Sequence, residues 1–155
     1  MKVFISHKQE DSTTAKEIHR ILQSLNVDAY LDLLEGELSL DGEALTQHIK
    51  RRLNECSDLL VVMSEETKKS WWVPFEIGLA AQRDFPTVTF LKTGTALPGY
   101  LEYWPRLKRY QDLEDYVRVK KEQDREALLE KAMGRTIQPS TVTRRFYDEL
   151  KLRIR

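Results

Sequence analysis

One seven-residue segment brings aromatic and acidic side chains close enough to act together: Ser70-Trp71-Trp72-Val73-Pro74-Phe75-Glu76. Pro74 favours a helix start, because the first helical turn does not need the N–H that proline lacks. Trp72 precedes Glu76 by about one helical turn, so the ring and the carboxylate can line one pocket. Near the third helical position, the helix dipole would favour the ionised form of Glu76. A simpler interpretation is a capping glutamate beside a core tryptophan.

Hydrophobic patterning predicts that strands and helices alternate around this segment. Short apolar runs are expected as strands at Lys2–Ser6, Val27–Leu31, Asp58–Met63 and Thr87–Leu91, with a brief fifth strand near Leu107–Tyr110. Helices are expected after caps at Asp11-Ser12 and Asp41, from Pro74, near Glu114–Met133 and from Pro139-Ser140. This alternation predicts an α/β fold, a doubly wound parallel sheet with helices on both faces and a C-terminal helix.

In a doubly wound sheet, ligands bind at the carboxyl ends of the strands. In this chain those ends are Ser6-His7-Lys8, Asp32-Leu33 and Ser64-Glu65. The stretch Leu33–Leu40 is acidic, contains a glycine and lacks a regular period, so it is expected to be a loop. A ligand site is therefore expected at this edge of the sheet.

Several familiar active-site motifs are absent from the sequence. It contains neither G-x-G-x-x-G nor G-x-x-x-x-G-K-[ST], so neither standard glycine-rich phosphate cradle is present. It also lacks G-x-S-x-G, which disfavours a hydrolase nucleophile elbow. A phospho-receiver domain needs an aspartate at the end of its third strand, where this chain has Ser64.

Histidine and cysteine usage disfavours metal and disulfide chemistry. Cys56 is the single cysteine, which excludes an intramolecular disulfide, and we expect it to be a buried apolar residue and not a nucleophile. His7, His19 and His48 have no second ligand at metal-binding spacing, so no metal site is expected. The cysteine count, the lack of a long apolar run and the lack of a signal-peptide pattern predict a cytoplasmic protein.

The charge pattern limits the classes of partner. The chain has 155 residues, with 25 Lys and Arg against 25 Asp and Glu and a pI near 6.8, which argues against nucleic-acid or polybasic membrane binding. Residues 1–91 carry 10 basic and 15 acidic side chains, whereas residues 92–155 carry 15 basic and 10 acidic ones, giving −5 and +5. These opposite charges favour head-to-tail contacts, so self-association is expected.

Three sequence blocks, taken in order, follow the pattern of one family. They are Lys2-Val3-Phe4-Ile5-Ser6-His7 with Asp11 after a short gap, Asp41-Gly42 followed by Leu45, Ile49 and the Cys56-Ser57 step into Leu59–Ser64, and Ser70-x-Trp72-x-x-x-Glu76. Together they resemble a Toll/interleukin-1 receptor (TIR) domain of the bacterial stand-alone, NAD-cleaving antiviral-defence kind (Thoeris-like). The resemblance implies a flavodoxin-like sheet of about five strands, with residues 1–125 as the TIR-like domain and residues 126–155 as a helical extension packed on it.

Two positions depart from the family pattern. The loop after the second strand usually ends in Pro-Gly, and this chain has Asp41-Gly42. A glycine often precedes the second strand, and this chain has Asn26, which tolerates a positive φ.

The resemblance implies cleavage of NAD+ at the nicotinamide–ribose bond, giving nicotinamide and ADP-ribose or a cyclic ADP-ribose signal. Glu76 matches the catalytic glutamate of the enzymatic members, and Trp72 would offer a stacking wall. Ser6, His7 and Lys8 would lie near the phosphates, and the loop containing Leu38 would gate the pocket. The implied substrate-binding residues are thus Ser6, His7, Lys8, Leu38 and Trp72. NAD+ is the substrate, and no further cofactor or metal is expected.

Two other functions remain open from the sequence. The chain could be a non-enzymatic TIR interaction module that self-associates or docks another TIR domain. It could also be a deoxyribosyltransferase-like nucleotide N-glycosidase, a group with the same general architecture that also uses a glutamate. In the enzymatic case, the product would signal to a separate effector protein in anti-phage immunity.

Overall fold

A computed structural model describes residues 1–31 and 42–154, whose five strands form a parallel sheet in the order β2-β1-β3-β4-β5. The strands are β1 Lys2–Ser6, β2 Asp28–Leu31, β3 Asp58–Met63, β4 Thr87–Leu91 and β5 Arg106–Leu107. The helices are α1 Ser12–Ser24, α2 Gly42–Asn54, α3 Trp72–Ala81, α4 Asp112–Ala132 and α5 Pro139–Arg153, with short 3-10 turns at Gln9–Asp11, Thr67–Lys69 and Gly99–Leu101. The predicted doubly wound α/β fold with a C-terminal helix is confirmed.

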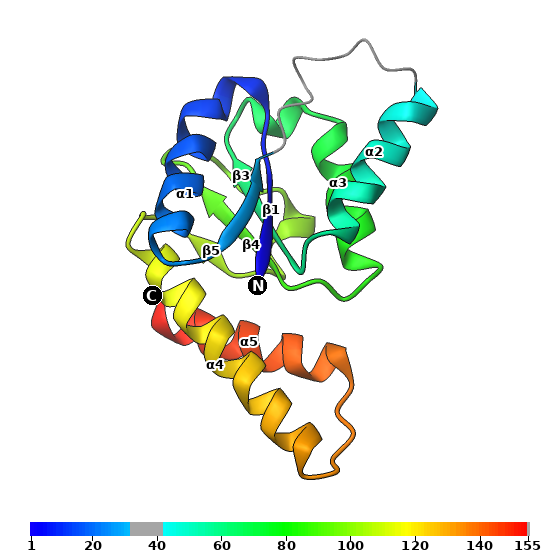
Figure 1. Cartoon of the computed structure of the whole chain (residues 1–155). Coiled ribbons are helices and arrows are strands. Elements are labelled where there is room, and N and C mark those ends of the chain that lie inside the picture. Colours follow the sequence, from blue (N-terminus) through cyan, green and yellow to red (C-terminus); the bar gives the residue numbers. More distant parts are fainter. Residues whose placement is uncertain (32–41, 155) are drawn as a thin grey trace.

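Helices cover both faces of the sheet and create two cores (Figure 1). Alternate residues of β3 point to opposite faces of the sheet. Leu60 and Val62 pack toward α1, α4 and α5. On the other face, α2 and α3 pack against Leu59, Val61 and Met63. All six residues of β3 are buried, as the continuous apolar run predicts for a central parallel strand.

The order of the strands reverses at β1. This strand pairs with β2 on one side and with β3 on the other, and Ser6 is in register with Val61. The carboxyl ends of β1 and β3 therefore mark the topological switch point, where doubly wound folds bind their ligands. The predicted ligand edge lies here.

Three local predictions need correction or lie outside the description. The fifth strand is only two residues long and begins at Arg106, one residue before the predicted stretch. Helix α3 begins at Trp72 and not at Pro74, because Ser70 Oγ accepts the N–H of Val73 and starts the helix earlier. Residues 32–41, which include the predicted loop, Leu38 and the Asp41 cap, lie outside the described residues.

Asn26 adopts the backbone conformation expected of the family's glycine. Asn26 lies between α1 and β2, and its φ of 54° is in the left-handed region. An asparagine adopts this conformation more readily than most residues, so the turn is retained without glycine.

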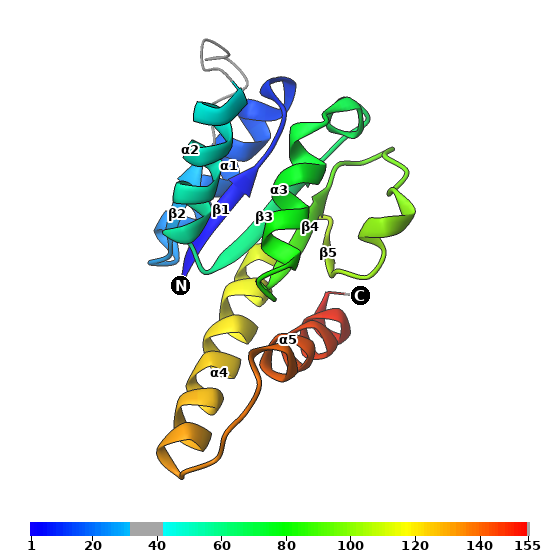
Figure 2. The same ribbon diagram turned by 90° about the vertical axis from the view of Figure 1, so that its right-hand side faces the viewer.

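Helices α4 and α5 form an antiparallel pair that extends beyond the end of the sheet at which the N-terminus lies (Figures 1 and 2). The first turns of α4 are buried in the core, where Leu113, Tyr116 and Val117 pack with Phe146 of α5. Residues from Lys121 to the end of α4 have no fully buried position. The division of the chain at residue 125 stays a prediction.

Candidate active site

A buried carboxylate lies at the switch point. Glu76 of α3 is only 2% exposed, and Ser6 at the end of β1 donates a hydrogen bond from Oγ to Glu76 Oε2. Ser6 is itself fully buried, and it faces α3 because side chains alternate along the strand. Two residues that are 70 positions apart in the sequence thus meet where the sheet order reverses.

Glu76 occupies a different helical position from the predicted one. Since α3 begins at Trp72, Glu76 is its fifth residue, and no acidic residue stands in the first turn. The helix-dipole argument for Glu76 is therefore wrong, because that effect is confined to the first turn. The contact that the structure gives its carboxylate is the hydrogen bond from Ser6 Oγ.

The other predicted site residues have separate environments. His7 is buried next to Ser6, and Lys8 Nζ lies 3.0 Å from Glu10 Oε1 and 3.8 Å from Glu66 Oε2. Both residues follow β1 directly, so they lie at the same edge of the sheet as Ser6.

The two tryptophans differ in exposure. Trp72 is half-buried, packs on the α2–α3 core and stacks on Trp71, with ring centroids 4.3 Å apart. Trp71 is 70% exposed. Trp72 therefore packs against the core, as the simpler interpretation of a core tryptophan expects. Its contact with substrate stays a prediction.

A second buried carboxylate stands at the same edge, on the α1 side of the sheet. Asp11 is 2% exposed and accepts hydrogen bonds from Ser64 Oγ, from Thr67 Oγ1 at 2.6 Å and from Lys92 Nζ at 2.7 Å. Ser64 and Lys92 directly follow β3 and β4. We call these four residues the Asp11 network. It connects the turn between β1 and α1 with the segments that follow β3 and β4.

Burial alone would raise the pKa of the Asp11 carboxyl, but the hydrogen bonds from Lys92, Ser64 and Thr67 hold that pKa below its usual range. Asp11 was predicted to cap α1, and its side chain makes no such bond. Its backbone N–H instead donates to the carbonyl of Lys8 at 2.8 Å. The network thereby fixes the turn that carries His7 and Lys8.

Sequence reasoning missed this network. Asp11 was predicted only as a helix cap and as part of the first family block, and Ser64 only as the residue after the third strand; Thr67 and Lys92 carried no signal. The predicted burial of Cys56 is confirmed, and burial raises the pKa of its thiol to about 11.

No helix among the described residues is long and apolar enough to cross a membrane. In residues 1–31 and 42–154, no group of three or more His, Cys, Asp or Glu side chains is arranged to hold a metal ion.

The order of the strands and the buried Ser6–Glu76 pair at the switch point define a doubly wound α/β protein with a candidate carboxylate site. The sequence model of the TIR domain matches residues 3–132, and the chain belongs to the TIR domain family.

Two curated relatives are similar to the chain over about half of its length. One is the putative cyclic ADP-D-ribose synthase TIR2 of Cytobacillus dafuensis, 28% identical over 79 residues, which are 48% of this chain and 21% of that protein. The other is the probable 3' cyclic ADP-D-ribose synthase ThsB' of Bacillus cereus (strain MSX-D12), 25% identical over 80 residues, which are 49% of this chain and 41% of that protein. In both comparisons, the match spans less than half of the relative's length.

The fold also resembles the solved structure of a 2-deoxyribosyltransferase from Bacillus psychrosaccharolyticus. The TM-score is 0.61 at 15% sequence identity, over 75% of this chain and 92% of that one. At this identity, the similarity concerns the fold.

Proposed function

We propose that this chain cleaves NAD+ at the nicotinamide–ribose bond, releasing nicotinamide and either ADP-ribose or a cyclic ADP-ribose. The observation that carries the proposal is the buried Glu76 carboxylate, hydrogen-bonded to Ser6 at the switch point of a TIR domain. The names of the two relatives support the same chemistry, because both are described as cyclic ADP-D-ribose synthases.

The proposed reaction uses Glu76 as an electrostatic group. When the bond between ribose C1′ and the nicotinamide nitrogen breaks, its electron pair goes to nicotinamide, which leaves as a neutral base without needing a strong general acid. Positive charge develops on the ribose as an oxocarbenium ion, as in other glycosidic cleavages. A carboxylate fixed beside that sugar stabilises the transition state more than the ground state. Water then adds to C1′ and releases a proton, or a nucleophile of the same molecule closes a ring.

Ser6 has a positioning role in this scheme. Its hydroxyl donates a hydrogen bond to one oxygen of Glu76 and so holds the carboxylate in one orientation. A carboxylate that is already oriented needs little reorganisation during the reaction. His7 and Lys8 are proposed to lie near the diphosphate, Trp72 beside a ring of the substrate, and Leu38 in the loop that gates the pocket.

The charges near the site need rearrangement when an anionic dinucleotide binds. Lys8 is paired with Glu10 and Glu66, and Lys92 is paired with Asp11. Because Glu10 and Glu66 are exposed, exchanging them for phosphate oxygens costs little. Lys8 is therefore the better phosphate ligand, and Lys92 is retained by the buried Asp11.

The proposed setting is bacterial anti-phage defence, in which the product signals to a separate effector protein. Self-association through the acidic and basic halves of the chain and a cytoplasmic location belong to the same proposal. The curated relatives extend well beyond the matched region, so these features are carried over as hypotheses.

Product analysis by mass spectrometry after incubation with NAD+ tests the proposal. We expect nicotinamide release by the wild type, little by Glu76→Gln, and normal release by Glu17→Gln, a matched change on the exposed face of α1. Equal release by wild type and Glu76→Gln would contradict the role of Glu76. Release of bases from deoxynucleosides but not from NAD+ would indicate the deoxyribosyltransferase-like alternative. Stoichiometric binding of another TIR domain without turnover, unaffected by Glu76→Gln, would indicate an interaction module.

A further inference from the structure

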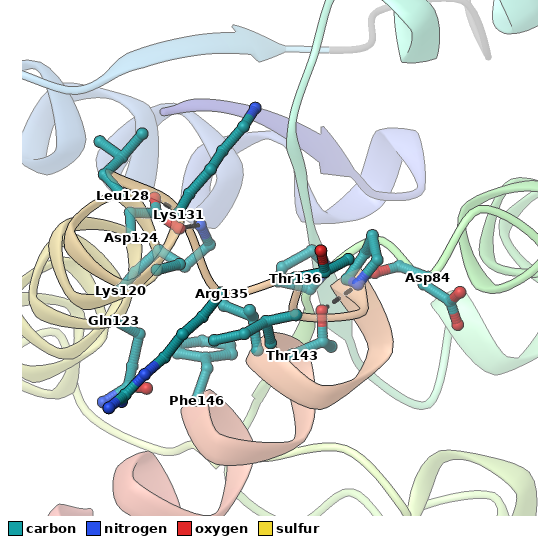
Figure 3. A pocket seen from close by; sticks show the side chains of 15 residues that line it. Asp84, Lys120, Gln123, Asp124, Leu128, Lys131, Arg135, Thr136, Thr143 and Phe146 are labelled. Carbon is teal, nitrogen blue, oxygen red and sulfur yellow. Dashed lines mark hydrogen bonds and ion pairs between the residues drawn. The ribbon is translucent and has the colours of Figure 1, made fainter. Parts of the chain in front are cut away.

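A cavity of about 670 Å³ lies between the two C-terminal helices, far along the chain from the Ser6–Glu76 site. It is bounded by the second half of α4, the connection at residues 135–137, the first turns of α5 and the segment that leads into β4 (Figure 3). Its volume falls within the range of about 300–1,000 Å³ that is typical of small-molecule sites. We name it the hairpin cavity.

Apolar groups form the floor and most of the walls of the hairpin cavity. Phe146 of α5, which is also part of the main core, closes its inner end. The walls are completed by Pro86, Ala127, Leu128, Ile137, Pro139 and Val142. Leu128 is 68% exposed, so the apolar lining continues to the surface of the molecule. An apolar chain or ring is thus the part of a ligand that this space would hold.

The charged groups of the lining are not balanced. Lys120 donates to Asp124 Oδ2 at 2.6 Å and lies 3.8 Å from the buried Asp58, so this cation is already held by two carboxylates. The Asp84 carboxylate points away from the other labelled side chains (Figure 3). Lys131 and Arg135 also line the cavity, and their side chains point to opposite sides of it (Figure 3). Among the described residues, Arg135 forms no ion pair.

We propose that the hairpin cavity binds a small amphipathic anion, with an apolar body against Phe146 and a carboxylate or phosphate head at Arg135. The apolar lining and the Arg135 guanidinium are complementary to such a molecule. This proposal does not depend on cleavage of NAD+, because the cavity and its lining residues are separate from Ser6, Glu76 and the Asp11 network.

Calorimetric titration of the whole chain with decanoate, at concentrations below micelle formation, tests the proposal. Decyltrimethylammonium, which has the same alkyl chain and the opposite charge, is the matched probe. We expect saturable binding of one decanoate per chain and binding of the cation that is at least tenfold weaker. Absence of decanoate binding, unsaturable binding or equal affinity for the two probes would overturn the proposal.

Two kinds of variant locate the bound anion. The change Arg135→Glu should weaken decanoate binding at least tenfold, whereas Arg144→Glu, on α5 but outside the lining, should change it less than twofold. Ala127→Trp should fill the cavity and abolish binding while leaving nicotinamide release unchanged. Equal effects of the two charge reversals would contradict the assigned head-group site. Sedimentation as a dimer that Ala127→Trp dissociates would assign the cavity to a second copy of the chain instead.

Discussion

A buried aspartate lies at each end of the sheet, and the two carboxylates differ in the hydrogen bonds and charges around them. At the carboxyl end, Asp11 accepts three hydrogen bonds, including one from the Lys92 ammonium. At the amino end, Asp58 accepts a hydrogen bond from Ser57 on one oxygen. Its other oxygen lies 3.8 Å from Lys120 and accepts no hydrogen bond from any residue in the described part of the chain.

The pKa values follow from these surroundings. Burial acts on both carboxyls, and at Asp11 the donors outweigh it, so the pKa falls below its usual range. At Asp58 burial outweighs Lys120 and Ser57, so the pKa rises to about 6. The donors at the carboxyl end therefore favour the ionised form of Asp11, whereas Asp58 at the amino end loses its proton only at higher pH. The proposed site with Glu76 lies at the carboxyl end, so variants at the two ends can be compared.

The largest expected effect is at Glu76. Glu76→Gln keeps the volume and removes the charge, so we expect nicotinamide release to fall by about 100-fold or more, because the oxocarbenium ion loses its stabilising group. Asp58→Asn, the matched removal of a buried carboxylate at the amino end, should leave release within about twofold. Both rates are measured by chromatography of nicotinamide. A similar loss in the two variants would remove the functional distinction between the ends.

Asp11→Asn should have the next largest effect, on both stability and substrate affinity. The amide cannot accept both the hydroxyl and the ammonium hydrogen bonds, so we expect the free energy of unfolding at pH 7.5 to fall by about 2 kcal/mol. Because the turn with His7 and Lys8 loses its anchor, KM for NAD+ should rise more than kcat falls. Denaturant unfolding and steady-state kinetics measure the two effects, and Lys92→Met should reproduce part of both. An unchanged KM in a stable Asp11→Asn protein would limit the network to a structural role.

Asp58→Asn should change stability in the opposite direction. A folded-state pKa of about 6, above an unfolded value of about 3.9, means that Asp58 contributes stability below about pH 4, which is lost as the pH rises through 6. Two pKa units correspond to about 3 kcal/mol as an upper limit. At pH 8 the Asn variant should therefore be more stable than the wild type by about 1–3 kcal/mol.

The shape of the pH dependence separates the two aspartates. The stability difference between wild type and Asp58→Asn should change steadily between pH 8 and pH 4. The difference for Asp11→Asn should stay constant down to about pH 5, because a lowered pKa affects stability only at lower pH. Urea unfolding at several pH values gives both curves. If the stability differences of the two variants changed with pH in the same way, the surroundings of Asp11 and Asp58 would not shift the two pKa values in opposite directions.

Much of the fold could be predicted because it depends on local pattern. The apolar run of β3 and the four-residue spacing in α5 identified those elements with their approximate bounds. The start of α3 was missed because Ser70 begins the helix before Pro74, and β5 is too short for a reliable pattern. Local patterns predict an element well and its first residue poorly.

The candidate site could be predicted only in part, because it is made by long-range pairing. The order of motifs identified Ser6 and Glu76, and the structure adds the hydrogen bond between them. Nothing in the sequence pairs Asp11 with Lys92, since their contact depends on the positions of β1, β3 and β4 in the sheet. The raised pKa of Asp58 is likewise a consequence of burial beneath α4, which no local pattern shows.

The smallest expected effects come from the two serines that donate to buried carboxylates at the opposite ends of the sheet. Ser6→Ala removes the hydrogen bond to Glu76, so kcat for nicotinamide release should fall about tenfold while the unfolding free energy changes by only about 1 kcal/mol. Ser57→Ala removes the hydrogen bond to Asp58, so the pKa of Asp58 should rise further and kcat should stay within about twofold. Kinetics and pH-dependent unfolding of both variants check this pair. If Ser57→Ala lowered kcat as much as Ser6→Ala, the fall would reflect general loosening of the sheet and not the orientation of Glu76.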